Sequence, residues 1–272
     1  MPELPEVETI TRELNRRIRG RRIEKVHVFR ADALGNRSPE AFADDLYRRE
    51  IHRVSRRGKF LIFHLRPRRY LVCHLRMTGK FIVTAPLRGP HPHHRLWFAL
   101  DDGSLLVFQD VRCLGTLEVV ARLSASASLE RLGIEPLSKD FCPEWLTEAL
   151  GRSRTPLKNW LMDQRRIAGL GNIYASEILF AAGISPTRPA DSIDGEGASR
   201  LHGMTKRILR MAIRKNGTTI SDFRRVDEKT GEFQNFLQVY GKTGEPCPRC
   251  KTPIVRIRQQ QRSTFYCPRC QL

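Results

Sequence analysis

The strongest constraint on this fold is a group of four cysteines near the end of the printed chain. They form two Cys-x-x-Cys pairs, Cys247 with Cys250 and Cys267 with Cys270, and sixteen residues separate the pairs. Two such pairs at this spacing can place four thiolates tetrahedrally around one zinc ion. Redox or disulfide motifs are the alternative, which a reducing compartment disfavours. Because four thiolates fill the coordination shell, we expect a structural zinc rather than a catalytic one.

The charge balance indicates what kind of partner the protein has. Lys and Arg number 48 against 29 Asp and Glu, which gives a net charge of +19 over 272 residues. This excess predicts a polyanionic partner, with nucleic acid ahead of an acidic membrane surface. A merely supercharged surface is the alternative. No apolar run approaches the ~20 residues of a membrane-spanning helix, and the acidic, Pro-rich start differs from a secretory signal. We therefore expect a cytoplasmic protein.

The N-terminal half is expected to form a helix followed by short strands. Pro5 and Glu6 suit the first turn of a helix, hydrophobic residues then recur at helical spacing to Ile18, and Gly20 ends the pattern. Short β-type runs separated by turns follow, and they predict a β-sandwich. The strands are expected at 23–29, 51–55, 60–65, 71–75, 80–83, 96–100, 105–108 and 116–120.

The C-terminal half is expected to be helical and to end in a zinc-bound hairpin. Gly169-Leu170-Gly171-Asn172 is a tight turn before a helix, which can either present N–H groups to a phosphate or simply join two helices. Strands at 253–257 and 264–266 with a turn at 259–262 predict the hairpin. A module this small needs the metal to become ordered. Residues 124–128 and 133–140 are expected to be loop and linker, with helices at 143–150, 155–163, 174–182 and 198–216.

Three motifs in chain order resemble one family. Residues 1–9 read Met-Pro-Glu-Leu-Pro-Glu-Val-Glu-Thr, residues 170–177 read Leu-Gly-Asn-Ile-Tyr-Ala-Ser-Glu, and residues 261–267 read Gln-Arg-Ser-Thr-Phe-Tyr-Cys. Together they resemble the formamidopyrimidine-DNA glycosylases, a branch of the formamidopyrimidine-glycosylase/endonuclease VIII family. The resemblance runs from residue 2 to residue 270. It implies an α+β protein with a catalytic helix-plus-sandwich domain at 1–131, a linker at 132–146, a helix–two-turn–helix domain at 147–237 and a zinc finger at 238–272.

The resemblance also implies a reaction: excision of 8-oxoguanine and formamidopyrimidines from duplex DNA, followed by strand cleavage through β,δ-elimination. Once Met1 is removed, Pro2 exposes a secondary amine that can attack the sugar C1′ and form a Schiff-base intermediate. Glu3 is placed to protonate the opening sugar. Lys59 matches the family's proton donor in β-elimination, although a phosphate-facing charge is the alternative. Arg262 matches the family's residue that donates a proton in δ-elimination and clamps a phosphate.

Further residues match the family's DNA contacts. A base buried in duplex DNA must be flipped out, and the gap must be filled. Met77 resembles the residue that fills the gap and Arg112 the one that reads the orphaned cytosine. The segment 218–233 lies where the family carries a lid over the flipped base. Additional contacts are expected from Leu114, His93, Arg154, Lys158, Asn172 and Tyr174, with the register ambiguous around residues 91–94 and 152–154.

The loop at 110–115 departs from the family pattern Asp-x-Arg-Arg/Lys-Phe-Gly, because Cys113 and Leu114 replace the second basic residue and the phenylalanine. Leu114 can still wedge between bases. It cannot stack as an aromatic ring does, and stacking contributes about 1–3 kcal/mol per base. We therefore hypothesise that this enzyme discriminates the opposite base less sharply than relatives that carry Phe.

Two alternatives remain open from the sequence. One is a glycosylase of the same fold that prefers oxidised pyrimidines, and the other is a non-enzymatic protein that binds damaged DNA. The set of Pro2, Glu3, Lys59 and Arg262 disfavours the binder, because binding needs no nucleophile. We expect a monomer whose partner is double-stranded DNA containing damaged bases, with zinc as the only cofactor, no membrane association, and a location with the nucleoid.

Overall fold

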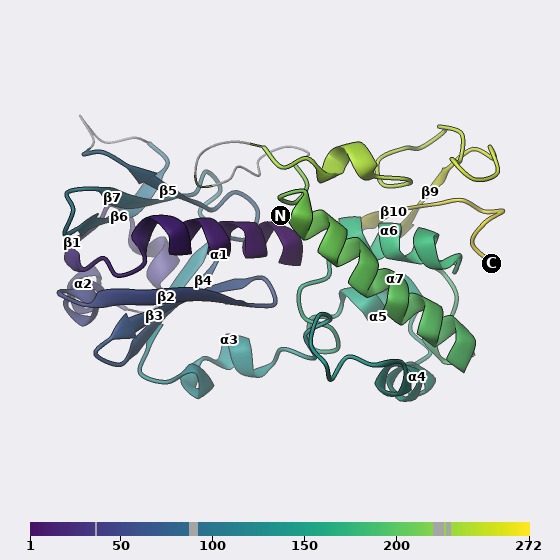
Figure 1. The fold of residues 1–272 in the computed structure, drawn as a ribbon, viewed down its shortest axis with the longest axis horizontal. Helices are drawn as coiled ribbons and strands as arrows, with labels where there is room; N and C mark the ends of the chain where they lie inside the picture. The colour runs from purple at the N-terminus through teal and green to yellow at the C-terminus, as the bar shows by residue number, and fades with distance from the viewer. Residues whose placement is uncertain (36, 87–91, 220–225, 227–229) are drawn as a thin grey trace. The chain divides into compact units, whose positions relative to one another are not determined.

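The computed structural model describes residues 1–35, 37–86, 92–219, 226 and 230–272 (Figure 1). His91 and most of the expected lid segment, at 220–225 and 227–229, lie outside the described residues. The chain forms two compact units. Unit 1 contains Met1–Glu130 and Lys215–Glu232, and unit 2 contains Arg131–Arg214 and Phe233–Leu272.

Unit 1 begins with helix α1, Leu4–Ile18. Glu3 is its N-cap, and Glu6 completes a capping box that satisfies backbone donors in the first turn. The apolar stripe predicted from the sequence is buried, with Val7, Leu14 and Ile18 inaccessible to solvent. Asn15 then joins α1 to a neighbouring strand, because its side-chain amide exchanges hydrogen bonds of 2.7 and 2.8 Å with the backbone of Val54.

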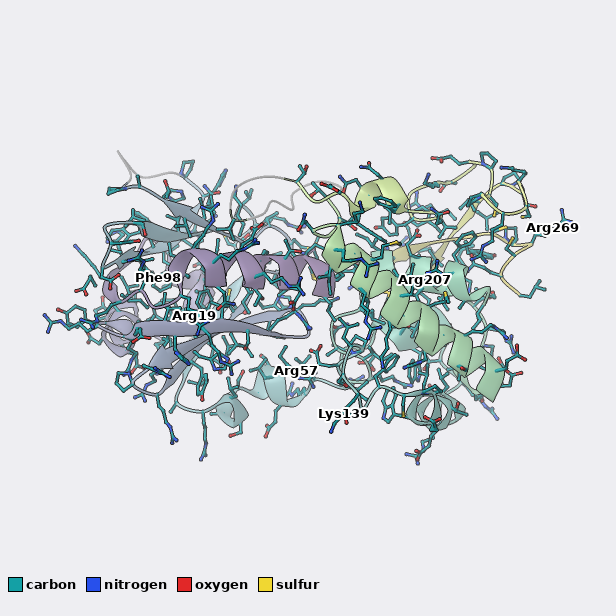
Figure 2. The ribbon with its side chains drawn as sticks, in the orientation of Figure 1. Arg19, Arg57, Phe98, Lys139, Arg207 and Arg269 are labelled. Atoms are coloured by element: carbon teal, nitrogen blue, oxygen red, sulfur yellow. The ribbon has the colours of Figure 1, made fainter. Side chains whose placement is uncertain are left out.

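The strands of unit 1 form the predicted sandwich of two antiparallel four-stranded sheets. Aromatic and aliphatic side chains fill its core, and Phe98 is inaccessible to solvent (Figure 2). Helix α1 contacts strands β2 and β3. One sheet has the order β1-β6-β7-β5, with β1 Ile23–Val28, β6 His94–Leu100, β7 Leu105–Gln109 and β5 Lys80–Thr84. The other has the order β2-β3-β4-β8, with β2 Glu50–Arg57, β3 Phe60–Arg66, β4 Arg69–His74 and β8 Thr116–Val120.

Several short helices of unit 1 correct the sequence prediction. Helix α2 spans Pro39–Leu46, between the first two strands, where no helix was predicted. Its start has a clear physical cause: the Ser38 hydroxyl accepts the N–H of Ala41, and proline occupies the first turn. The 3₁₀ turn η1, Ala31–Leu34, precedes it. The expected loop at 124–128 contains the turn η2, Leu123–Ala125, and the start of α3, Ala127–Glu130.

Unit 2 is built around packed helices. Helix α7 contacts α4 and α6, and α6 also contacts α5. Gly183 ends α6 in the left-handed conformation with φ 71°, a geometry that favours glycine. The bounds are α4 Pro143–Gly151, α5 Leu157–Met162, α6 Asn172–Ala182, η3 Ala190–Ser192, α7 Gly195–Arg214 and η4 Phe233–Phe236.

A two-stranded hairpin completes unit 2. Strands β9, Val255–Gln259, and β10, Arg262–Tyr266, pair in antiparallel register. The turn between them is Gln260-Gln261, with positive φ values of 44° and 62°. Both values suit a tight two-residue turn. The sequence predicted strands at 253–257 and 264–266; β9 is shifted by two residues towards the turn and β10 begins two residues earlier, so the turn is shorter than expected. Among the described residues, no helix has the length and apolar character needed to cross a membrane.

Candidate active site and nucleic-acid interface

The first candidate catalytic residues lie at the start of α1. Pro2 is buried, and Glu3 is 3% exposed. The carboxylate of Glu6 fixes this end of the chain from two sides: it accepts the N–H of Glu3 at 2.8 Å and the N–H of Thr218 at 2.7 Å. From the sequence, Glu6 was predicted only to lie in the first turn of the helix. Its spacing of three residues from Glu3 is the capping-box signal that could have indicated the first contact.

Lys59 is the second residue of the two-residue turn between β2 and β3, in which Gly58 has a φ of 54°. The Lys59 side chain is only 4% exposed. An ion pair of 3.3 Å between Arg56 and Glu8 links the end of β2 to α1, so the turn that carries Lys59 is tied to the helix that begins with the candidate nucleophile. Burial lowers the pKa of His74 to about 3, and the positive charges of Arg76 and Lys59 add to this effect. Lys59 therefore lies within electrostatic range of a neutral imidazole.

Asp110 organises the loop that carries the candidate base-contacting residues. Its buried carboxylate accepts the Thr78 hydroxyl and three backbone N–H groups, those of Arg112 at 3.2 Å, Leu114 at 2.8 Å and Gly115 at 2.7 Å. Arg95 holds the same loop from its other side by donating to the backbone oxygen of Asp110 at 2.6 Å. This role of Asp110 was not predicted from the sequence. An acid at the end of a strand followed by a Gly-terminated loop is the signal that could have indicated it.

The residues on this loop project into solvent. Leu114 is 44% exposed, and Met77, in the loop connected through Thr78, is 37% exposed. Arg112 is also exposed. Cys113 has a φ of 54°, an uncommon conformation for a non-glycine residue, which the hydrogen bonds to Asp110 help to maintain. Exposed apolar side chains held on a rigid loop suit insertion between bases.

Lys158 and Asn172 connect three elements of unit 2. The ammonium group of Lys158 donates to Asn172 Oδ1 at 2.6 Å, to the Ser263 backbone oxygen at 2.9 Å and to Thr264 Oγ1 at 2.7 Å. Asn172 also donates to the Ser263 oxygen at 3.0 Å. Lys158 is only 1% exposed. This network fixes α5, the start of α6 and strand β10, and thereby sets the position of Arg262.

The remaining predicted contacts differ in exposure. The Tyr174 side chain is fully buried and lies 5.7 Å from the ring of Phe233. Arg154 is 94% exposed and lies 3.6 Å from Asp191. Arg262 is exposed at the hairpin turn. His93 is half-buried, and its backbone oxygen accepts the N–H of Asp110.

The four cysteines form a compact zinc site. The Sγ atoms of Cys247, Cys250, Cys267 and Cys270 all lie within 4.8 Å of one another, a spacing that fits a tetrahedral four-thiolate shell. Glu177 of α6 supports the chain that enters this module. Its carboxylate accepts the backbone N–H groups of residues 238–240 at 2.9, 3.0 and 2.9 Å. Burial raises the pKa of Glu177, and the three hydrogen bonds oppose this shift.

The two units thus divide the predicted site. Unit 1 holds Pro2, Glu3, Lys59, Met77, His93, Arg112 and Leu114, and unit 2 holds Arg154, Lys158, Asn172, Tyr174, Arg262 and the four cysteines. The combination of a helix-capped sandwich, a helical unit and a four-cysteine hairpin defines a zinc-finger protein of the helix–two-turn–helix class.

Comparison with known families supports this class and identifies one family within it. Residues 1–117 match the formamidopyrimidine-DNA glycosylase N-terminal domain. Residues 132–224 match the helix–two-turn–helix domain of the same glycosylase, and residues 244–272 match the zinc finger found in FPG and IleRS. The chain belongs to the formamidopyrimidine-DNA glycosylase family.

Individual relatives support the assignment over the full length. The formamidopyrimidine-DNA glycosylases of Symbiobacterium thermophilum and Geobacillus kaustophilus are each 43% identical over 274 residues, covering 100% of this chain and 89% and 100% of theirs. A Lactococcus lactis FPG variant, solved with DNA containing Fapy-dG, is 36% identical with a TM-score of 0.93 and 99% coverage of both chains. The Thermus thermophilus FPG protein is 40% identical with a TM-score of 0.89, covering 99% of this chain and 98% of that one.

Proposed function

We propose that this protein is a DNA glycosylase and abasic-site lyase that removes oxidised purines in base excision repair. The observation that carries the proposal is the anchored N-terminus: Pro2 and Glu3 are buried, and Glu6 fixes the backbone beside them. Chain termini are usually frayed. A terminus held in place in this way suits a nucleophile that must meet one sugar carbon in a defined geometry.

The reaction begins after removal of Met1, when Pro2 presents a secondary amine. The nitrogen of Pro2 forms a bond to C1′ as the bond from C1′ to the damaged base breaks, and the base leaves with a proton. Glu3 protonates the ring oxygen of the sugar, and the ring opens to an iminium ion. This cation accepts the electrons released when a C2′ proton is lost, so the 3′ phosphate leaves by β-elimination. Loss of the C4′ proton from the resulting conjugated iminium then expels the 5′ phosphate by δ-elimination. Water then hydrolyses the iminium and restores the amine.

Lys59 and Arg262 serve the later steps in this proposal. Lys59 donates a proton during β-elimination, and its burial beside neutral His74 keeps its environment partly dehydrated. Arg262 clamps a phosphate next to the lesion and acts in δ-elimination. Zinc takes no part in bond breaking, because the four cysteines complete its shell. It keeps Arg262 on an ordered hairpin.

The remaining predicted residues bind the duplex. Met77 and Leu114 occupy the gap left by the flipped nucleotide, and Arg112 reads the unpaired cytosine. His93, Arg154 and Asn172 line the surface around the phosphates, and Lys158 and Tyr174 lie beneath it. Within that group we assign Lys158 and the buried Tyr174 mainly to supporting the turn at Asn172. We place the monomeric protein in the cytoplasm with the nucleoid, where its DNA substrate lies.

A panel of duplexes tests the substrate class. We expect excision of 8-oxoguanine and formamidopyrimidines at much higher kcat/KM than excision of thymine glycol or 5-hydroxycytosine. A preference for the two pyrimidine lesions would support the alternative glycosylase. Mass spectrometry of the purified protein separates the enzyme from a binder, because a retained Met1 or a blocked Pro2 amine would leave no nucleophile.

A further inference from the structure

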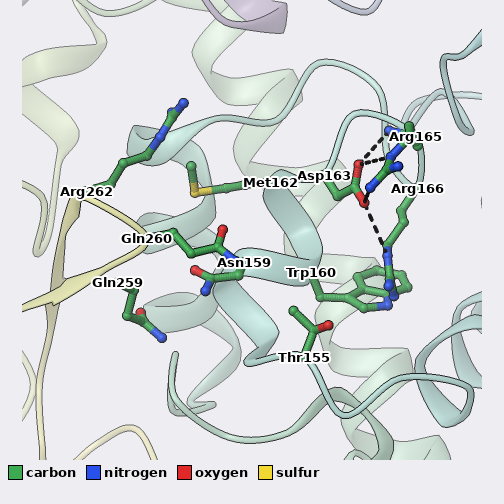
Figure 3. Close-up of a pocket in the computed structure, with 10 residues that line it drawn as sticks. All are labelled: Thr155, Asn159, Trp160, Met162, Asp163, Arg165, Arg166, Gln259, Gln260 and Arg262. Carbon is green, nitrogen blue, oxygen red and sulfur yellow. Dashed lines mark hydrogen bonds and ion pairs between the residues drawn. The ribbon is translucent and has the colours of Figure 1, made fainter.

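Unit 2 contains a polar cavity beside Arg262 that the reaction described above does not use. Its volume is about 400 Å³. One wall comes from α5 and the loop after it, and the other comes from the hairpin turn at Gln259, Gln260 and Arg262 (Figure 3). The α5 side includes Trp160, Asp163, Arg165 and Arg166.

Two arginines on the α5 side are oriented by one carboxylate. Arg165 donates through Nε and Nη2 to the two oxygens of Asp163, both at 3.2 Å. Arg166 Nε lies 3.6 Å from Asp163 Oδ2, and its guanidinium lies 5.2 Å from the centre of the Trp160 ring. Burial alone would raise the pKa of Asp163, but the hydrogen bonds from Arg165 and the charges of Arg165 and Arg166 together hold this pKa below its ordinary value. With Arg262, the cavity carries three cationic side chains and one ionised carboxylate.

The loop that carries these arginines is already fixed in shape. The Gln164 amide donates to the backbone oxygens of Met162 and Leu170, both at 2.8 Å, and accepts the N–H of Gly169 at 2.9 Å. A ligand that binds in the cavity therefore contacts cations that are already oriented. Because the loop is already ordered, binding costs little conformational entropy.

Trp160 provides a second, independent indication of a ligand. It lines the cavity and is 1% exposed. Its indole nitrogen is buried and has no hydrogen-bond partner among the described residues. A buried donor without an acceptor is unfavourable and uncommon in native proteins, so it indicates a place for an oxygen atom from outside the chain.

We propose that this cavity binds one backbone phosphate of the DNA strand, adjacent to the phosphate that Arg262 clamps. Arg165 and Arg166 neutralise its charge, and the Trp160 N–H donates to one of its oxygens. A phosphodiester satisfies all three groups, because it supplies a negative charge and several acceptors in a small volume. The identification of the partner as DNA rests on the proposed function, whereas the cavity and its cations do not.

The salt dependence of DNA binding tests this site. Affinity for an undamaged duplex is measured by fluorescence anisotropy over a range of KCl concentrations for wild type and for Arg165→Gln/Arg166→Gln. Neutralising one phosphate contributes a slope of about −0.9 to log K against log[salt]. We expect the slope of the variant to be shallower by about 1. Arg207→Gln/Arg210→Gln is the matched control, because it removes two exposed arginines from α7 outside the cavity (Figure 2 labels Arg207).

Single methylphosphonate substitutions then locate the contact. These duplexes carry an uncleavable abasic-site analogue, which fixes the register of the protein. In wild type we expect one position, next to the analogue, where the neutral linkage weakens binding several-fold, and Arg165→Gln/Arg166→Gln should lose no further affinity there. Trp160→Phe, which keeps a ring but removes the N–H, should reduce the same effect. The proposal is overturned if the cavity variant matches the α7 control in slope, or if no linkage shows coupling to the cavity arginines. Both measurements use uncleaved DNA, so failure of the glycosylase proposal would appear separately, as an absence of borohydride trapping.

Discussion

The substitution Asp110→Asn tests how the loop that carries the base-contacting residues is held. The two carboxylate oxygens of Asp110 receive two donors each: Thr78 Oγ1 and the Arg112 N–H on Oδ1, and the Leu114 and Gly115 N–H groups on Oδ2. An asparagine keeps one accepting oxygen, and its NH₂ group cannot accept. With the NH₂ group at the Oδ2 position, the Leu114 and Gly115 N–H groups lose their acceptor. With the NH₂ group at the Oδ1 position, the Arg112 N–H loses its acceptor and the Thr78 hydroxyl must turn from donating to accepting.

The expected loss of stability follows from these contacts. A hydrogen bond to a charged group contributes about 1.5–3 kcal/mol, and one to a neutral group contributes less. Losing one or two bonds, together with the charge on the acceptor of the others, should therefore lower the free energy of unfolding by about 3 kcal/mol. For a unit of this size, that corresponds to a decrease in Tm of roughly 6–12 °C. Asp110 is 1% exposed, so water cannot replace the lost partners.

Urea unfolding followed by circular dichroism measures the effect. Asp44→Asn is the control, because Asp44 is exposed on α2 and its substitution should change stability by less than about 0.5 kcal/mol. Excision by Asp110→Asn should also fall, since Leu114 and Arg112 lose their fixed positions. A variant that unfolds within about 0.5 kcal/mol of wild type would refute the assigned role of Asp110.

Three further predictions concern other parts of the molecule. Removing zinc with a chelator should disorder the hairpin and abolish specific DNA binding, because a two-stranded ribbon is marginal alone; retained binding by metal-free protein, verified by atomic absorption, would contradict this. His74 stays neutral in the fold, with its pKa lowered to about 3, so stability should fall as pH drops from about 6.5 towards 3, by about 1.4 kcal/mol per pH unit. His74→Asn keeps an acceptor for the Arg76 N–H and should flatten this dependence of stability on pH. An unchanged pH profile would show that groups other than His74 cause the acid sensitivity. Leu114→Phe should sharpen discrimination between cytosine and adenine opposite the lesion, measured as the ratio of single-turnover excision rates, and a wild-type ratio as high as in Phe-carrying relatives would refute the underlying hypothesis.

Local patterns predicted much of the fold. The apolar spacing from Val7 to Ile18 identified α1, and all eight expected strands occur, with Thr116–Val120 found at its predicted bounds. The zinc cysteines were predicted from spacing alone. Helix α2 was missed although Ser38-Pro39 is a start signal, because the helix is short and lies between strands. Its sequence carried enough information for the prediction.

Contacts between distant residues were not predictable in the same way. The three acceptors of Lys158 lie 14, 105 and 106 residues away, and no spacing rule relates them. The strand order β1-β6-β7-β5 likewise depends on which hydrophobic faces meet after the chain collapses. The sequence identified Lys158 through a family resemblance. The structure adds that its ammonium is used to join α5, α6 and the hairpin.

The measurement that tests the central claim most directly is borohydride trapping on an 8-oxoguanine:cytosine duplex. Wild type is compared with Pro2→Gly, and an undamaged duplex serves as the control. The account predicts a covalent adduct between the wild-type N-terminus and the damaged strand, no adduct on undamaged DNA, and a severe loss of adduct in the variant. Zinc-loaded wild-type protein that binds the damaged duplex without forming an adduct would contradict the amine mechanism.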